Sequence, residues 1–190
     1  MRLFIGLSLP GDAQQATARL AARAAELIPG RYALAENYHI TLAFLGESQP
    51  RDVPRIGEVL ARCAARMPAP LLSPGQPDVF GRMENSILVL RMGSLPALEP
   101  LNESLCATLR SEGLPVSDGP FTPHVTLARH AAASPQALHA LSAPAASVPS
   151  FRAQRARLYL SARDEHGILR YTPLLDAPFS PSFPSFDRSL

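Results

Sequence analysis

The sequence contains no lysine and no tryptophan, and all 18 of its basic residues are arginine. The missing lysine excludes chemistry that depends on a Schiff-base amine or on the lysine of a phosphate-binding P-loop. Any cationic contact with phosphate must come from guanidinium groups, which can bind two oxygens at once. The formal net charge is only +2, so the chain also lacks the strongly basic character of proteins that coat nucleic acid.

Cysteine and long apolar runs are scarce as well. Cys63 and Cys106 lie far apart within helix-like patterns, which argues against a disulfide framework and against structural zinc. We expect both to be buried thiols of a protein in the reducing cytoplasm. No run approaches the roughly 20 apolar residues of a membrane span, and the short run 3–9 is interpreted as a first strand rather than a signal peptide.

Hydrophobic spacing divides the chain into alternating strands and helices, which indicates the α+β class with helices packed on antiparallel or mixed sheets. The 190 residues suit one domain or two small lobes that share a core. Residues 178–190, rich in proline, serine and phenylalanine, are interpreted as a C-terminal tail. Strands are predicted at 3–9, 39–46, 71–80, 86–92, 124–129, 156–162 and 168–174, and helices at 13–27, 52–66, 94–113 and after 134.

One pattern occurs twice, once in each half of the chain. The segments His39-Ile40-Thr41-Leu42 and His124-Val125-Thr126-Leu127 share the order histidine, apolar residue, threonine, apolar residue. Residues two apart on a strand face the same side, so the histidine and threonine of each copy point together. If a pseudo-two-fold axis relates the halves, the two imidazoles meet across a cleft with the hydroxyls between them.

Such a pair of imidazoles suits acid–base chemistry at phosphorus. Histidine titrates near pH ~6.5, so one ring can act as base while the other, protonated, acts as acid. Threonine hydroxyls can donate to the non-bridging phosphate oxygens during an in-line displacement. Symmetry alone does not decide which histidine holds the proton.

The two motifs resemble the paired HxTx motifs of the 2H phosphoesterase superfamily, in its branch of RNA 2′,3′-cyclic phosphodiesterases, first known as 2′-5′ RNA ligases. The resemblance covers nearly the whole chain and is carried mainly by residues 36–47, ENYHITLAFLGE, and 121–129, FTPHVTLAR. It implies two pseudo-symmetric α+β lobes of antiparallel or mixed sheet, with flanking helices, around a V-shaped central groove. Residues 1–177 would form this single bilobal domain.

The resemblance also implies a reaction and a role for each motif residue. The protein would hydrolyse the 2′,3′-cyclic phosphate at an RNA 3′ end to a 2′-phosphate, without a metal or any other cofactor. His39 would be the proton donor to the departing 3′ oxygen, and His124 the proton acceptor that activates water. Thr41 and Thr126 would bind the phosphate. The expected partners are RNA 3′ ends, tRNA fragments among them, or small cyclic nucleotides, and we expect a monomer without a protein partner.

Two arginines beside the motifs also fit the family pattern. Arg129 is a candidate phosphate ligand, but it lies five residues after His124, and a straight strand would point it to the opposite face. Either the strand ends or bulges before Arg129, or this arginine has a structural role. Arg31, before the first motif, is a further candidate, and His130 could rim the groove.

Other interpretations stay open at this point. The same groups, run in reverse with an RNA 5′-hydroxyl in place of water, would form a 2′-5′ linkage. A non-catalytic protein could use the groove to bind RNA or nucleotides. A metallohydrolase is disfavoured, because no carboxylate or third histidine lies at ligand spacing near either motif. The arginines at 152, 155 and 157 form either a solvated face or a track for an RNA backbone.

Overall fold

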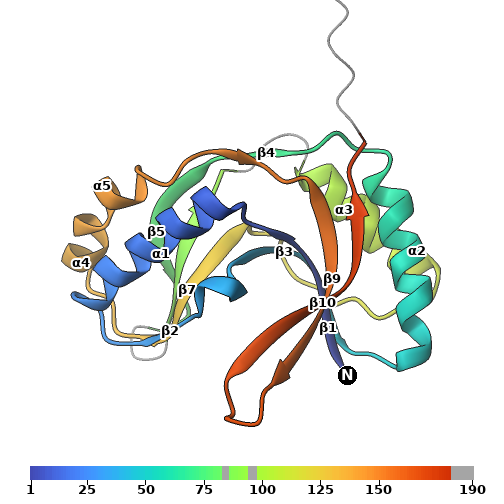
Figure 1. Cartoon of the computed structure of the whole chain (residues 1–190), viewed down its shortest axis with the longest axis horizontal. Coiled ribbons are helices and arrows are strands. Elements are labelled where there is room, and N and C mark those ends of the chain that lie inside the picture. Colours follow the sequence, from blue (N-terminus) through green and yellow to red (C-terminus); the bar gives the residue numbers. More distant parts are fainter. Residues whose placement is uncertain (83–85, 94–97, 181–190) are drawn as a thin grey trace, which may run out of the picture.

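The protein, whose computed structural model describes residues 1–82, 86–93 and 98–180, is built around one antiparallel sheet (Figure 1). The strand order is β10-β9-β1-β3-β7-β6-β5, and β2 pairs with β7 outside this path. A separate two-stranded sheet joins β4 to β8. The strands are β1 (Arg2–Ser8), β2 (Arg31–Tyr32), β3 (His39–Glu47), β4 (Leu71–Leu72), β5 (Pro74–Phe80), β6 (Ser86–Met92), β7 (His124–Ala131), β8 (Phe151–Arg152), β9 (Arg155–Arg163) and β10 (Leu169–Pro178).

The helices form two groups, one for each half of the sheet (Figure 1). Helices α2 (Val53–Ala64) and α3 (Leu98–Ser111) pack on each other and on the half that contains β3, β9 and β10. The other half, with β5, β6 and β7, carries α1 (Gly11–Ala25), α4 (Pro135–Ala140) and α5 (Ser142–Ala145). The expected α+β fold with two lobes is confirmed. None of the described helices combines the length and the apolar composition needed to cross a bilayer.

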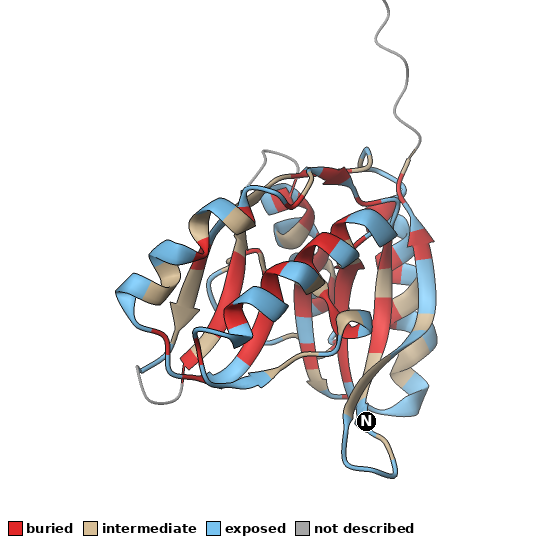
Figure 2. Ribbon diagram, turned by 60° about the vertical axis from the view of Figure 1, so that its left-hand side comes forward, coloured by how far each residue is buried: buried red, intermediate tan, exposed pale blue. Residues whose placement is uncertain are grey.

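The buried faces of the helices follow from their apolar spacing. In α3, leucines at positions 98, 101, 105 and 109 are all buried, because steps of three and four residues return to one side of a helix. Figure 2 shows the same preference on other elements, where buried residues lie on the inner faces. Cys63 is buried as expected, whereas the prediction for Cys106 is wrong, since this thiol is half-buried. Both thiols are free.

The two halves of the sheet meet at β3 and β7. The one residue pair in register between these strands is Ile40 with Val125, the apolar residues directly after the two motif histidines. Both side chains are fully buried. The junction of the lobes is therefore also the centre of the pseudo-two-fold relation that the repeated motif predicts.

The last strand is longer than predicted: β10 continues to Pro178, whereas the predicted strand ends at 174. After it, the side chain of Phe179 is buried, and the backbone amide of Ser180 donates to the carbonyl of Met67 at 3.0 Å. Residues 181–190, which include the other two phenylalanines of the predicted tail, lie outside the described residues. So do 83–85 of the predicted strand connection and 94–97 of the predicted third helix.

Candidate active site

The junction of the lobes places the two motifs side by side. Because Ile40 and Val125 are antiparallel partners, continuing the register by one residue sets each histidine across from the threonine of the other motif. Two cavities agree with this placement. One is lined by Thr41 and His124, and the other by His39 and Thr126. The structure thus brings together the four motif residues singled out in the sequence.

Both imidazoles are held by the same kind of contact. Nδ1 of His39 lies 2.7 Å from the carbonyl oxygen of Asn37, and Nδ1 of His124 lies 2.7 Å from that of Thr122. A carbonyl oxygen only accepts, so Nδ1 carries a proton in each ring, and Nε2 is the nitrogen that gains or loses the second proton. Nε2 of His39 lies 3.0 Å from Oγ1 of Thr41, whose hydroxyl donates to it when the ring is neutral.

Burial lowers the pKa of both histidines. The pKa of His39 falls to about 4, mainly because burial disfavours the charged ring; the Asn37 carbonyl opposes this effect, and the charges of His124 and Arg129 add to it. Burial is also the main cause that lowers the pKa of His124, opposed by its backbone hydrogen bond and reinforced by Arg91 and Arg129. The charge of Arg129 thus lowers the pKa of both rings.

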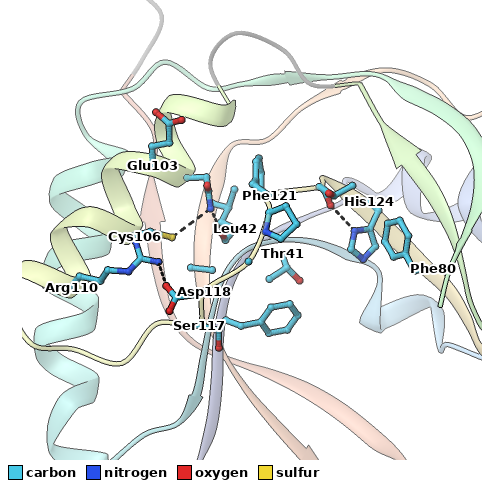
Figure 3. Close-up of a pocket in the computed structure, with 16 residues that line it drawn as sticks. Thr41, Leu42, Phe80, Glu103, Cys106, Arg110, Ser117, Asp118, Phe121 and His124 are labelled. Atoms are coloured by element: carbon cyan, nitrogen blue, oxygen red, sulfur yellow. Dashed lines mark hydrogen bonds and ion pairs between the residues drawn. The ribbon is translucent and has the colours of Figure 1, made fainter.

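Aromatic side chains fix the orientation of the two imidazoles. Phe80 packs edge-on against His124, with ring centroids 4.8 Å apart and an interplanar angle of 89° (Figure 3). Tyr171 packs against His39 in the same way, with ring centroids 4.9 Å apart and an interplanar angle of 86°. The ring centroid of Phe4 lies 4.6 Å from that of His39. Each ring is therefore held by a carbonyl at one nitrogen and by aromatic packing.

A bulge follows the threonine in both motif strands. The register of β7 on β6 skips Leu127, and the register of β3 on β1 skips Leu42. A bulge changes the face on which later residues lie. The first six residues of β3 and β7 accordingly show the same sequence of burial. After the threonine, each strand has two adjacent buried residues and then an exposed one. The exposed residues are Phe44 and Arg129, so the bulge brings both onto the face of the histidines. The strand therefore bulges before Arg129, one of the alternatives left open above.

The cavity beside Thr41 and His124 is the larger one, at about 700 Å³, and its lining includes three phenylalanines. Phe44, Phe80 and Phe121 line it, and Phe44 is 50% exposed. Figure 3 shows Phe80 beside the imidazole of His124. Glu103 and Asp118 also line this cavity, and Asp118 forms an ion pair of 2.8 Å with an arginine of α3. We call it the aromatic cavity.

The second cavity, beside His39 and Thr126, is smaller, at about 200 Å³, and positively charged. Arg31, Arg129 and Arg163 line it together with His130, and its lining includes no carboxylate among the residues that the structure describes. We call it the cationic cavity. The candidate site thus has two chemically different ends, with one histidine and one threonine at each.

The arginine cluster near the last strands lines neither cavity. Arg155 and Arg157 both form ion pairs with Asp176, and Arg152 donates to the carbonyl of Ala69 at 2.9 Å. Of the two interpretations of this cluster, the placement favours a solvated and internally paired surface over a track for RNA.

Within residues 1–82, 86–93 and 98–180, no three His, Cys, Asp or Glu side chains lie close enough together to hold a metal ion. His39 and His124 by themselves supply fewer protein ligands than the three or four typical of zinc sites.

Sequence reasoning missed the residues that support the imidazoles. Asn37 uses its side-chain amide to donate to the carbonyl of Leu169 at 2.8 Å and to accept from the amide of Tyr171 at 3.2 Å. It therefore holds β10 beside His39 while its carbonyl orients that ring. One of these contacts is local in the sequence: the carbonyl that orients each histidine belongs to the residue two positions before it. The packing of Tyr171 and Phe80 has no such signal, since their strands are remote in sequence.

Known proteins resemble this chain over the part that contains the site. The family profile described as the 2′-5′ RNA ligase superfamily matches residues 9–167, which include both motifs. An RNA 2′,3′-cyclic phosphodiesterase from Geobacillus stearothermophilus is 32% identical over an alignment of 183 residues that covers 92% of this chain, and the chain spans 58% of that relative's length. A protein of the same name from Escherichia coli (strain K12) is 29% identical over an alignment of 175 residues that covers 91% of this chain and 93% of the relative.

Solved structures agree in fold over both lobes. The crystal structure of E. coli LigT in apo form matches with a TM-score of 0.74 and 27% identity, over 94% of this chain and 97% of that chain. LigT complexed with 3′-AMP matches with a TM-score of 0.71 and 27% identity, over 94% of this chain and 98% of that chain.

Proposed function

Because the chain belongs to the 2′-5′ RNA ligase superfamily, we propose that it hydrolyses the 2′,3′-cyclic phosphate at the 3′ end of RNA to a 2′-phosphate. The observation that carries the proposal is the juxtaposition of two His-x-Thr motifs at the junction of β3 and β7. Relatives that match more than nine-tenths of this chain are RNA 2′,3′-cyclic phosphodiesterases, which supports the same activity here.

The reacting phosphate lies between the two imidazoles in this proposal. Thr41 and Thr126 come from opposite strands and donate to its non-bridging oxygens. Arg129 lies on the face of the histidines and lines the cavity that contains His39 and Thr126, so its guanidinium offsets the charge that develops on these oxygens.

The two histidines move the protons. Water attacks phosphorus opposite the 3′ oxygen, and the new P–O bond forms as the bond to the 3′ oxygen breaks. Nε2 of His124 takes a proton from the water, and Nε2 of His39 gives its proton to the 3′ oxygen. The ribose is left with a 3′-hydroxyl and a 2′-phosphate, and the two rings exchange their protonation states through solvent before the next cycle.

The donor role requires that His39 gain a proton when substrate binds. In the free protein its pKa of about 4 keeps the ring neutral, with the Thr41 hydroxyl donating to Nε2. A bound phosphate brings negative charge next to the ring and raises this pKa. The hydroxyl of Thr41 is then free to turn from the ring to the phosphate.

A direct assay tests the proposed function. The protein is incubated with a short RNA that ends in a 2′,3′-cyclic phosphate, with and without EDTA, and the product is analysed for the position of its phosphate. We expect the 2′-phosphate at the same rate in both samples. A rate lost with EDTA would indicate a metal-dependent reaction, and binding without turnover would indicate a binding protein. A 2′-5′-linked product in the presence of an RNA with a 5′-hydroxyl would show that the site also runs in reverse.

The aromatic cavity is the place for the terminal nucleobase. Stacking of a base on an aromatic side chain contributes about 1–3 kcal/mol, so Phe44→Ala is expected to lower kcat/KM for 2′,3′-cyclic AMP by about tenfold or more. Phe44→Leu keeps apolar contact but has no ring face, so its kcat/KM should lie between those of the wild type and Phe44→Ala. Leu27→Ala removes an exposed apolar side chain that lines neither cavity and serves as the control. An unchanged kcat/KM in Phe44→Ala would place the base elsewhere.

Assembly and location complete the proposal. All four motif residues come from one chain, so a monomer contains the whole reaction centre. The two free thiols suit a reducing compartment such as the cytoplasm.

A further inference from the structure

We propose that the cationic cavity is a second phosphate subsite, in which Arg31 and Arg163 bind the phosphodiester on the 5′ side of the terminal nucleotide. The inference rests on the proposed function and specifies its substrate as an oligonucleotide rather than a mononucleotide. Arg129, which lies on the face of the histidines, is left to the reacting phosphate.

The first observation is a concentration of like charge. Arg31 on β2 is the cross-strand partner of Arg129 on β7, and side chains directly opposite in an antiparallel pair lie about 5 Å apart at Cβ. Like charges at that separation destabilise a sheet. In the described part of the chain, the ion pairs between arginine and carboxylate all involve other arginines. An anion bound between these guanidinium groups would neutralise the repulsion.

The second observation is the position of this charge relative to the reaction centre. His39 and Thr126 line the cationic cavity, so it opens directly onto the reacting phosphate. The aromatic cavity at the opposite end is lined by Glu103, Asp118 and one arginine, Arg110, which forms an ion pair with Asp118, so it offers much less positive charge to a further phosphate. With the terminal base in the aromatic cavity, the cationic cavity is the end that accepts the preceding phosphodiester.

The third observation is that Arg163 stands on a firmly attached hairpin. It ends β9, and Figure 1 shows that the β9–β10 hairpin extends beyond the rest of the sheet. Asn37 holds the hairpin through Leu169 and Tyr171, as described above, and Arg170 forms ion pairs with Glu36 and Asp164. The guanidinium of Arg163 donates one hydrogen bond to the carbonyl of Gly167 in the turn of the same hairpin, which holds it at the cavity wall, and its exposure leaves its other N–H groups accessible to a ligand.

Three substrates test the subsite. They are 2′,3′-cyclic AMP, the dinucleotide ApA with a 2′,3′-cyclic phosphate, and the same dinucleotide with an uncharged methylphosphonate linkage. We expect kcat/KM to be about tenfold higher or more for the charged dinucleotide than for the other two, as is typical of a charge-assisted contact. This preference should weaken with added salt, because phosphate contacts release counterions. Equal kcat/KM for all three substrates would overturn the subsite.

Variants assign the preference to residues. Arg31→Gln and Arg163→Gln should each lower the ratio of kcat/KM between the charged dinucleotide and 2′,3′-cyclic AMP, and the double variant should bring it near one. Arg19→Gln, at an exposed position of α1 outside both cavities, should keep the wild-type ratio. A wild-type ratio in the double variant would also overturn the subsite. Failure of the proposed function looks different, since none of the three substrates would then be hydrolysed.

Discussion

His39→Ala lowers kcat for a 2′,3′-cyclic phosphate by about 10²–10⁴-fold, the usual effect of removing acid–base catalysis. A substrate with sulfur in place of the 3′ bridging oxygen should recover most of the lost rate in this variant. The proposed role of His39 is to protonate the departing 3′ oxygen. A thiol has a pKa of about 8.5, far below that of an alcohol, so a 3′ sulfur leaves without a proton. Single-turnover rates on the oxygen and sulfur substrates measure the rescue.

His124→Ala is expected to lose a similar factor without rescue by sulfur. The proposed role of His124 is to accept a proton from water, and the sulfur substrate still needs that step. Rescue of His124→Ala instead of His39→Ala would exchange the two roles, and near-normal rates in either variant would refute the two-histidine mechanism. His139→Ala is the matched control, because this histidine is exposed on α4 and lines neither cavity. Thermal unfolding of each variant separates lost chemistry from lost folding.

The parts of the fold that were predictable from the sequence depend on local spacing. The leucines of α3 repeat every three or four residues, and β3 and β7 begin at the motif histidines as predicted. The order of strands in the sheet depends on contacts between distant segments and leaves no such local pattern. Strand β2 has only two residues, too few to show the alternation that marks a strand.

The same division holds for the candidate site. Its four motif residues were predictable because the pattern repeats and fixes their face on each strand. The orientation of Arg129 depended on a bulge, and a signal for it was present in both halves. Leu42-Ala43 and Leu127-Ala128 each break the alternation directly after the threonine, and both pairs are buried. The aromatic side chains on the imidazoles come from β1, β5 and β10, so only the folded structure shows them.

The profile of kcat/KM against pH for 2′,3′-cyclic AMP should be a bell with its optimum on the acid side of pH 6.5. This quantity reports the free protein, in which one ring must be neutral and the other protonated. Below the pKa of His39, about 4, both rings are protonated, so His124 cannot accept a proton from water. Above the pKa of His124, which burial lowers from its usual value, both rings are neutral, so His39 has no proton to give to the 3′ oxygen. Between the limbs the two rings share one proton, and catalysis uses the molecules in which His39 holds it. Each limb should fall about tenfold per pH unit.

The profile of kcat should lie at higher pH than that of kcat/KM, because the bound phosphate raises the pKa of both rings. The same argument predicts that the protein takes up protons when inorganic phosphate binds at pH 7. Calorimetry in buffers of different ionisation enthalpy measures this uptake, and the His39→Gln variant should take up fewer protons than the wild type.

Arg129→Gln removes a positive charge that lowers both pKa values, so both limbs of kcat/KM should move to higher pH. The proposal that substrate binding protonates His39 would be contradicted by two results together. These are profiles of kcat and kcat/KM that coincide with an optimum above pH 7, and phosphate binding that takes up no proton.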